Sequence, residues 1–118
     1  MITRYYPEDC STQLKTMIDH IYDKYNGYVC QNSFGSYPVF RLKSDSPNYE
    51  TETETKLQIA TKVSVWDNSK LVVFGYKIVN DVDEIDAGMI ELDNKFKIAY
   101  NDLKMRQMNS DFMEVNYV

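Results

Sequence analysis

The sequence predicts an α+β fold: a single domain, residues 1–118, with one N-terminal amphipathic helix packed on an antiparallel β-sheet. Apolar residues recur at helical spacing before residue 26. From residue 28 onward they mostly alternate with polar residues, as in strands that bury one face. A chain of 118 residues with 43% hydrophobic and 26% charged residues can fill one core and is short for two domains.

The helix is expected over about residues 7–26. Pro7 suits a first helical position, and Glu8 beside it favours the positive end of the helix dipole. Asn26 and Gly27 supply the left-handed conformation that ends many helices. Between these ends, six side chains fall on one helical stripe: Leu14, Met17, Ile18, Ile21, Tyr22 and Tyr25.

Antiparallel strands are expected from about residue 28 onward. The segment 51–65 is the clearest, because its odd-numbered positions are apolar or threonine and its even-numbered positions are largely charged. A turn at 67–70 then leads into another strand, and 85–92 is ambiguous between helix and strand. The expected strands are 28–31, 37–43, 51–65, 71–79, 95–100 and 113–117.

Acidic residues are unevenly distributed. Thirteen Lys and Arg against eighteen Asp and Glu give a net charge of −5, and ten of the eighteen acids fall in two windows, 44–55 and 78–94, that contain no Lys or Arg. If the 67–70 turn closes a hairpin whose pairing continues past Asn80, both windows meet at its far end. The predicted partner-binding residues are therefore Glu50, Glu52, Glu54, Asp81, Asp83, Glu84 and Asp86.

The sequence contains no catalytic or cofactor motif. His20 is the only histidine, and four scattered glycines form neither a dinucleotide-binding motif nor a P-loop. The acidic segment 81–88 fails as an EF-hand loop, because its fifth and sixth positions are Ile and Asp. Cys10 and Cys30 lack a C-x-x-C spacing and are expected to be reduced, as in a cytoplasmic protein. We therefore predict no catalytic residues, no metal site and no cofactor.

These observations predict a non-enzymatic, acidic binding protein. Carboxylates spaced along a strand can stand in for phosphates, so we expect an inhibitor that occupies the basic nucleic-acid groove of a target enzyme. In size and charge the chain resembles phage and mobile-element inhibitors of the anti-CRISPR and anti-restriction type. The expected partner is a basic protein surface, with no direct binding to nucleic acid or to membranes.

Two alternative functions remain open. Ten tyrosines, which favour protein contacts where they are exposed, suit an accessory or assembly subunit with an obligate protein–protein interface. The clustered carboxylates suit a divalent-metal-binding module. Association that survives high salt would indicate the first function, whereas a thermal shift with Mg²⁺, Mn²⁺ or Ca²⁺ that EDTA reverses would indicate the second.

Overall fold

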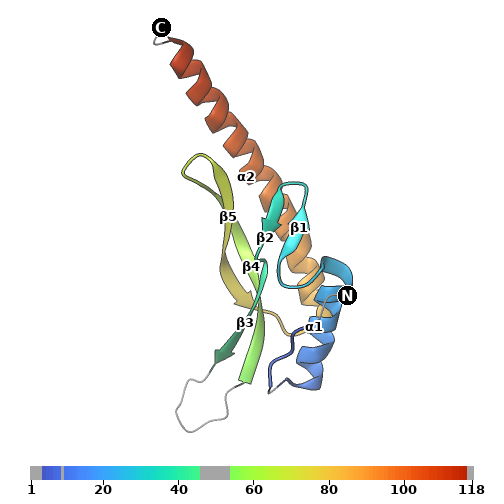
Figure 1. The fold of residues 1–118 in the computed structure, drawn as a ribbon. Coiled ribbons are helices and arrows are strands. Elements are labelled where there is room, and N and C mark those ends of the chain that lie inside the picture. The colour runs from blue at the N-terminus through green and yellow to red at the C-terminus, as the bar shows by residue number, and fades with distance from the viewer. Residues whose placement is uncertain (1–3, 9, 46–53, 117–118) are drawn as a thin grey trace.

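The computed structural model describes residues 4–8, 10–45 and 54–116, and the side chains of 45, 54 and 109–116 lie outside this description. Two helices and two antiparallel sheets form these segments (Figure 1). In chain order the elements are α1 (Thr12–Tyr25), β1 (Cys30–Asn32), β2 (Gly35–Tyr37), β3 (Phe40–Asp45), β4 (Glu54–Trp66), β5 (Lys70–Ile78) and α2 (Val82–Asn116). The predicted α+β class is confirmed.

Helix α1 begins later than predicted and ends where expected. The Ser11 hydroxyl accepts a hydrogen bond from the Leu14 N–H at 3.1 Å and caps the helix, so Pro7 lies outside it. At the other end Asn26 has a φ of 68° and Gly27 a φ of 103°, which confirms the left-handed cap. The stripe is confirmed at its four buried members: Leu14, Met17, Ile18 and Ile21.

The larger sheet has the strand order β3-β4-β5 and is antiparallel throughout. The alternation predicted for the long strand is confirmed on its buried face, where Thr55, Leu57 and Ile59 point into the core. Strand β3 pairs Phe40 with Ile59 and Leu42 with Leu57, so its apolar side chains face the same way. One side of this sheet therefore faces the helices.

The segment predicted to hold two short strands holds three. Strands β1 and β2 form a separate hairpin, and Pro38 follows β2 without an N–H to continue a ladder. Pairing restarts at Phe40, now with β4 as the partner. The rings of Phe34 and Tyr37 lie 6.1 and 4.7 Å from the ring of Phe96, so this hairpin packs on α2.

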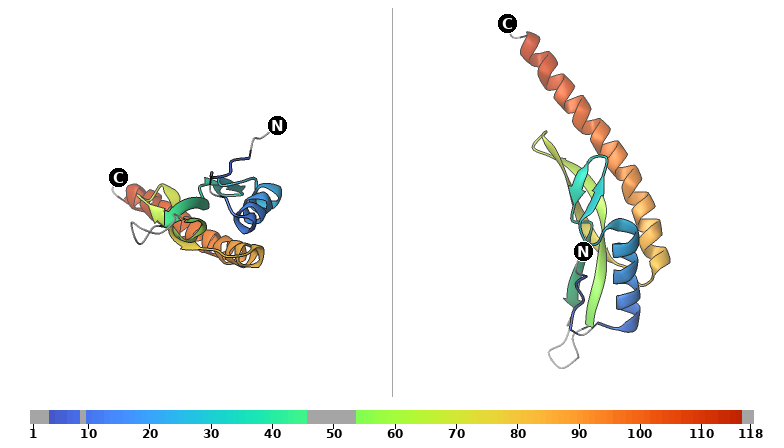
Figure 2. Two further views of the ribbon diagram at one scale, coloured as in Figure 1. Left: turned by 90° about the horizontal axis from the view of Figure 1, so that it is seen from below. Right: turned by 45° about the vertical axis from the view of Figure 1, so that its right-hand side comes forward.

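The predicted strands at 95–100 and 113–117 are wrong, because α2 is helical from Val82 to Asn116; residue 117 lies outside the described part. The buried side chains of α2 recur at helical spacing: Ile85, Leu92, Phe96, Ala99 and Leu103. This C-terminal helix, rather than the N-terminal α1, runs along β4 and covers most of the inner side of the sheet (Figures 1 and 2). The layout predicted with one helix is corrected accordingly.

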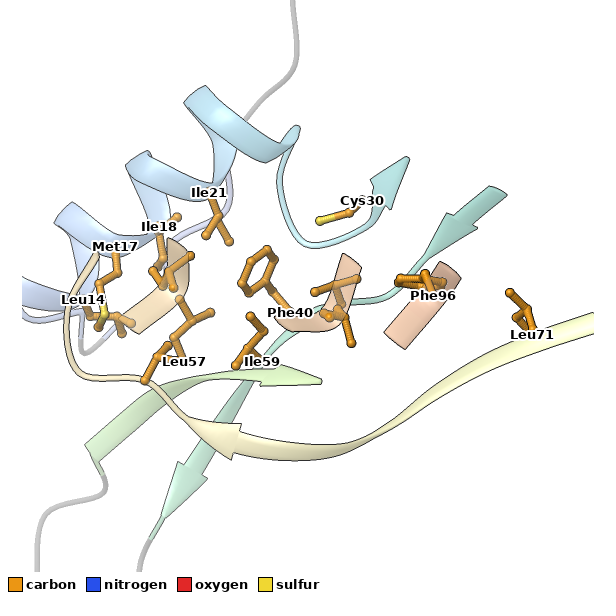
Figure 3. Close-up of a cluster of buried hydrophobic side chains, with 14 of the residues drawn as sticks. Leu14, Met17, Ile18, Ile21, Cys30, Phe40, Leu57, Ile59, Leu71 and Phe96 are labelled. Carbon is orange, nitrogen blue, oxygen red and sulfur yellow. The ribbon is translucent and has the colours of Figure 1, made fainter. Parts of the chain in front are cut away.

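The two helices and the sheet share one hydrophobic core. Ile18 and Ile21 of α1 face Leu57 and Ile59 of β4, and Phe96 of α2 lies farther along the same cluster (Figure 3). All five side chains are at most 2% exposed, so each contributes on the order of 2 kcal/mol through burial. This shared core holds α2 against the sheet.

Helix α2 projects beyond the sheet (Figures 1 and 2). Its 35 residues span about 52 Å at 1.5 Å per residue. The molecule measures 65 × 35 × 25 Å, and its radius of gyration of 18.1 Å exceeds the roughly 13 Å typical of a domain near this length. Leu103 is the last buried residue of α2 among the side chains described, so the helix continues past the core that holds it.

Candidate functional site

The two acidic windows do not meet along a β-hairpin. Strand β5 ends at Ile78, which pairs with Gln58, and the chain enters α2 from Asp81 onward. Pairing therefore stops before it can set any acid of the second window opposite Glu54. The prediction that the windows face each other across paired strands is wrong.

The turn between β4 and β5 is shorter than the predicted turn at 67–70. Trp66 pairs with Lys70, so three residues rather than four connect the two strands. Asp67 and Asn68 have φ values of 53° and 54°, the positive φ values that a tight hairpin turn requires. Since a shift of one residue reverses the two faces of a strand, the even-numbered residues of β5 point away from the core. A four-residue turn at 67–70 would instead have pointed them inward.

Asp81 and Glu84 form the N-terminal cap of α2. The Asp81 carboxylate accepts a hydrogen bond from the Glu84 N–H at 2.8 Å, and the Glu84 carboxylate accepts one from the Asn80 N–H at 2.9 Å. The pair is a variant of the capping box: Asp replaces the usual Ser or Thr, and the Glu84 carboxylate reaches the N–H of the residue before the N-cap. Both carboxylates therefore satisfy backbone N–H groups, a structural role that the sequence analysis did not assign.

Asp86 joins α2 to α1. Its carboxylate lies 2.8 Å from His20 Nε2 and 3.3 Å from Lys24 Nζ, and it accepts a hydrogen bond of 2.5 Å from the Tyr25 hydroxyl. The bonds from Tyr25, His20 and Lys24 lower the pKa of Asp86 to about 2. Burial and the same carboxylate raise the pKa of Tyr25. Asp86 is thus a partly exposed anion whose contacts tie the two helices together.

The remaining predicted residues are only partly described by the structure. Asp83 is exposed on the first turn of α2. Glu54 begins β4 opposite Asp45, with its side chain outside the description, and Glu50 and Glu52 lie in the part of the chain not described. The structure gathers the four predicted acids of the second window at the start of α2, where three of them make contacts within the chain.

Metal ligands are not clustered in the described part of the chain. No group of three or more His, Cys, Asp or Glu side chains there is placed to hold a metal ion. Cys30 is buried, and burial raises the pKa of its thiol to about 12. No disulfide joins Cys30 to Cys10.

Sequence reasoning missed an apolar stripe on the exposed side of α2. Its members are each at least 63% exposed, and at 100° per residue they fall within about 80° of the helix circumference. This apolar stripe consists of Ile90, Ile98, Met105 and Met108. It lies nearly opposite the buried side chains of α2. Over the described residues, neither helix is both long and apolar enough to cross a membrane.

A second surface covers the side of the β3-β4-β5 sheet that faces away from α2. We call it the outer face; its charged and aromatic members are Arg41, Lys43, Lys56, Lys62, Trp66, Lys70, Phe74 and Tyr76. The Arg41 guanidinium lies 4.0 Å from the centroid of the Tyr76 ring, and its Nε donates to Gln58 Oε1 at 2.7 Å. Cations and aromatic rings are therefore interleaved on this face.

Comparison with known proteins assigns neither surface. No protein-family model, curated protein or solved structure matches this chain. Function is therefore inferred from the contacts, exposure and charges of the chain's own residues.

Proposed function

We propose that this protein is a non-enzymatic assembly protein that acts through a protein–protein interface, formed when α2 pairs with α2 of a second copy. The apolar stripe on the projecting helix carries this proposal. Burying apolar side chains gains about 25 cal/mol per Å² removed from water, and contiguous exposed apolar surface marks interaction sites. A projecting helix is also accessible to a partner along its length.

The spacing along α2 suits a coiled coil. In a heptad repeat the a and d positions recur at alternating intervals of three and four residues and form the seam between two helices. The residues with this spacing are Ile98, Asn101, Met105 and Met108, and the sequence continues it at Phe112 and Val115. An asparagine in the seam restricts the registers that two helices can adopt. A second copy presents the same pattern, so the pair can be symmetric.

Charged side chains beside the seam fit a parallel pair. In a parallel coiled coil a g position faces the e position five residues farther along the partner helix. Lys97 and Asp102 occupy these positions, so each copy offers the other a Lys–Asp contact. Within one chain, Lys97 pairs with Asp93 at 3.4 Å and Asp102 with Arg106 at 3.1 Å. Such exposed i,i+4 pairs contribute little to stability. Replacing them by Lys97–Asp102 contacts between the two copies therefore costs little free energy.

Pairing through the seam leaves the domain core intact. The buried residues Leu92, Phe96 and Leu103 lie on the opposite side of α2, against the sheet and the β1–β2 hairpin. Two copies can therefore join through α2 with their sheets directed outward. The interface needs no rearrangement of either copy, which avoids the ordering cost of a segment that folds on binding.

The test is the mass of the full chain in solution, measured by sedimentation at several concentrations and at low and high salt. We expect a dimer that survives high salt, since apolar contacts are not screened. The combined variant Ile98→Gln, Met105→Gln, Met108→Gln should be a folded monomer by circular dichroism. The matched control, with Leu at the same three positions, should remain a dimer. A wild-type monomer at every concentration contradicts the proposal.

An inhibitor that inserts carboxylates into a basic nucleic-acid groove stays a second, weaker proposal. Asp83 is exposed and available for such contacts, whereas Asp81, Glu84 and Asp86 contact groups within the chain. Capture of a nucleic-acid enzyme from the native host's lysate that is released by salt and abolished by Asp83→Asn would favour the inhibitor. A partner retained in high salt by both forms would favour the assembly protein.

A further inference from the structure

We propose that the outer face of the β3-β4-β5 sheet binds single-stranded nucleic acid. Five cations and three aromatic rings lie on this face, and none of its described side chains is acidic. The cations attract the phosphates, and the rings offer flat surfaces on which bases can stack. This binding site is separate from the apolar stripe of α2 and does not depend on dimer formation.

The net charge of −5 conceals this local excess of positive charge. Five of the thirteen Lys and Arg residues lie on the outer face, beside no acidic side chain among those described there. The acids described at the start of α2 lie on the other side of the sheet (Figure 2). An anionic ligand is thus attracted to one face and repelled elsewhere, which orients its approach.

Two of the three rings, those of Trp66 and Phe74, are exposed where a base can reach them. Trp66 is 60% exposed and Phe74 is 44% exposed, an unusual placement for large apolar side chains unless they contact a ligand. Phe74 and Tyr76 are two residues apart on β5, so their side chains leave the same face about 6.8 Å apart. A base–aromatic contact at Trp66 or Phe74 is sequence-tolerant, because every base has a flat π surface.

Cations stand beside these rings. Lys62 pairs with Phe74 across the strands, with its Nζ 5.9 Å from the ring centroid, and Lys70 pairs with Trp66. Arg41 is stacked on Tyr76 and hydrogen-bonded to Gln58, which fixes both side chains on the sheet. A single nucleic-acid strand that lies across the outer face can therefore place a base on a ring and the neighbouring phosphate next to a cation.

The shape of the outer face favours a single strand over a duplex. Three strands about 4.8 Å apart form a surface broader than the two-stranded ribbon that a major groove about 12 Å wide admits. Bases paired inside a duplex also keep their flat surfaces covered by their neighbours. An acidic protein segment could bind to the cations as well. Binding of such a segment would not account for the exposed rings of Trp66 and Phe74 among them.

The experiment measures the fluorescence anisotropy of labelled oligothymidylate on titration with the full-length protein. Trp66 is the only tryptophan, so quenching of its emission reports stacking on the outer face directly. Trp66→Ala with Phe74→Ala should weaken binding at least tenfold, since each stacked base is worth about 1–3 kcal/mol. If all five cations contact phosphates, the logarithm of affinity should fall with the logarithm of salt at a slope of about −3.5.

The charge control separates local binding from general attraction. Lys43→Gln with Lys62→Gln should reduce the salt slope by about 1.4, whereas Lys15→Gln on α1 with Lys104→Gln on α2 should leave it unchanged. No anisotropy change at low salt, equal effects of the two charge variants, or equal affinity for a duplex would each overturn the proposal. Binding of polyglutamate but not of oligothymidylate would also overturn it and assign the face to an acidic protein segment.

Discussion

The imidazole of His20 and the carboxylate of Asp86 lie 2.8 Å apart and connect the two helices, although the two residues are 66 positions apart in sequence. His20 is on α1, close to the domain core, and Asp86 is on the first turns of α2. Tyr25 and Lys24 of α1 reach the same carboxylate. The only histidine of the chain thus takes part in a contact that joins α2 to α1.

This contact predicts that stability depends on pH in the acid range. The folded-state pKa of Asp86 is about 2, below the roughly 3.9 of an unfolded aspartate, so the folded state binds fewer protons between these values. The stabilisation from Asp86 is fully present above about pH 4 and is lost as pH falls through 2. Asp86→Asn should lower the free energy of unfolding by about 1–2 kcal/mol near neutral pH. A fully buried carboxylate would lose more, because solvent screens the contacts of this partly exposed side chain.

Urea unfolding of wild type and Asp86→Asn over a pH series measures this effect. The difference between their free energies of unfolding should shrink as the pH is lowered from about 4 toward 2. Asp93→Asn, which removes an exposed carboxylate from the same helix, is the control and should cost only a few tenths of a kcal/mol. A difference that stays constant down to pH 2 is incompatible with a carboxylate held ionised by α1.

The capping box makes a second prediction. Asp81→Ala removes the acceptor for the Glu84 N–H and should lower the free energy of unfolding by about 1 kcal/mol. Asp81→Asn should cost less, because asparagine also caps helices well. Asp83 lies two residues farther along, in the first turn of α2, and is exposed. Asp83→Ala should lower the free energy of unfolding by only a few tenths of a kcal/mol, through the lost interaction with the helix dipole. Equal losses at residues 81 and 83 in urea unfolding would rule out a specific cap.

The first helix and the long strand could be predicted because each has one pattern and one buried face. Leu14, Met17 and Ile18 follow the helical period, and Thr55 and Leu57 follow the strand period, so local pattern and tertiary burial agree. The start of α1 was misplaced because Pro7 and Ser11 both suit a helix start. The helix begins after Ser11, because the Ser11 hydroxyl accepts a hydrogen bond from the Leu14 N–H.

The second helix was missed because it is apolar on two sides. Ile90 and Ile98 are exposed, yet they are interspersed among the buried residues of α2 in sequence and obscure the helical period of that set. In 95–100 the alternation of Phe96 and Ile98 with lysines imitates a strand. The surplus apolar residues that conceal the helix are the ones that form the apolar stripe, so the failed prediction has the same cause as the proposed interface.

The residues of the proposed binding face could not be located from the charge pattern along the chain. Average charge places no residue on a face, and the register of the β4–β5 hairpin depends on the positive φ of Asp67 and Asn68, a choice among several turns that suit this sequence. The resulting shift by one residue turns Phe74 and Tyr76 outward, beside Lys62 and Arg41. Hairpin register, rather than composition, thus creates the outer face.

The close approach of α2 to β4 gives the third prediction. A Cβ added at Gly88 would lie 2.9 Å from Ile59 Cδ1, too close to fit without movement, and no positive φ restricts this helical position. Gly88→Ala alone should therefore fall short of the stabilisation of about 1 kcal/mol that helix propensity predicts. Ile59→Val alone removes Cδ1 and should cost about 0.5–1.5 kcal/mol by leaving a cavity.

Together the two substitutions should compensate. In the double variant the new methyl group occupies the space that Cδ1 leaves, and the nearest remaining atom of residue 59 is 3.6 Å away, an ordinary van der Waals distance. The double variant should be more stable than the sum of the single effects predicts by about 1 kcal/mol, measured by urea unfolding of all four proteins. Strict additivity would mean that α2 does not lie on β4 at this distance, and both the apolar stripe and the outer face would then need to be placed anew.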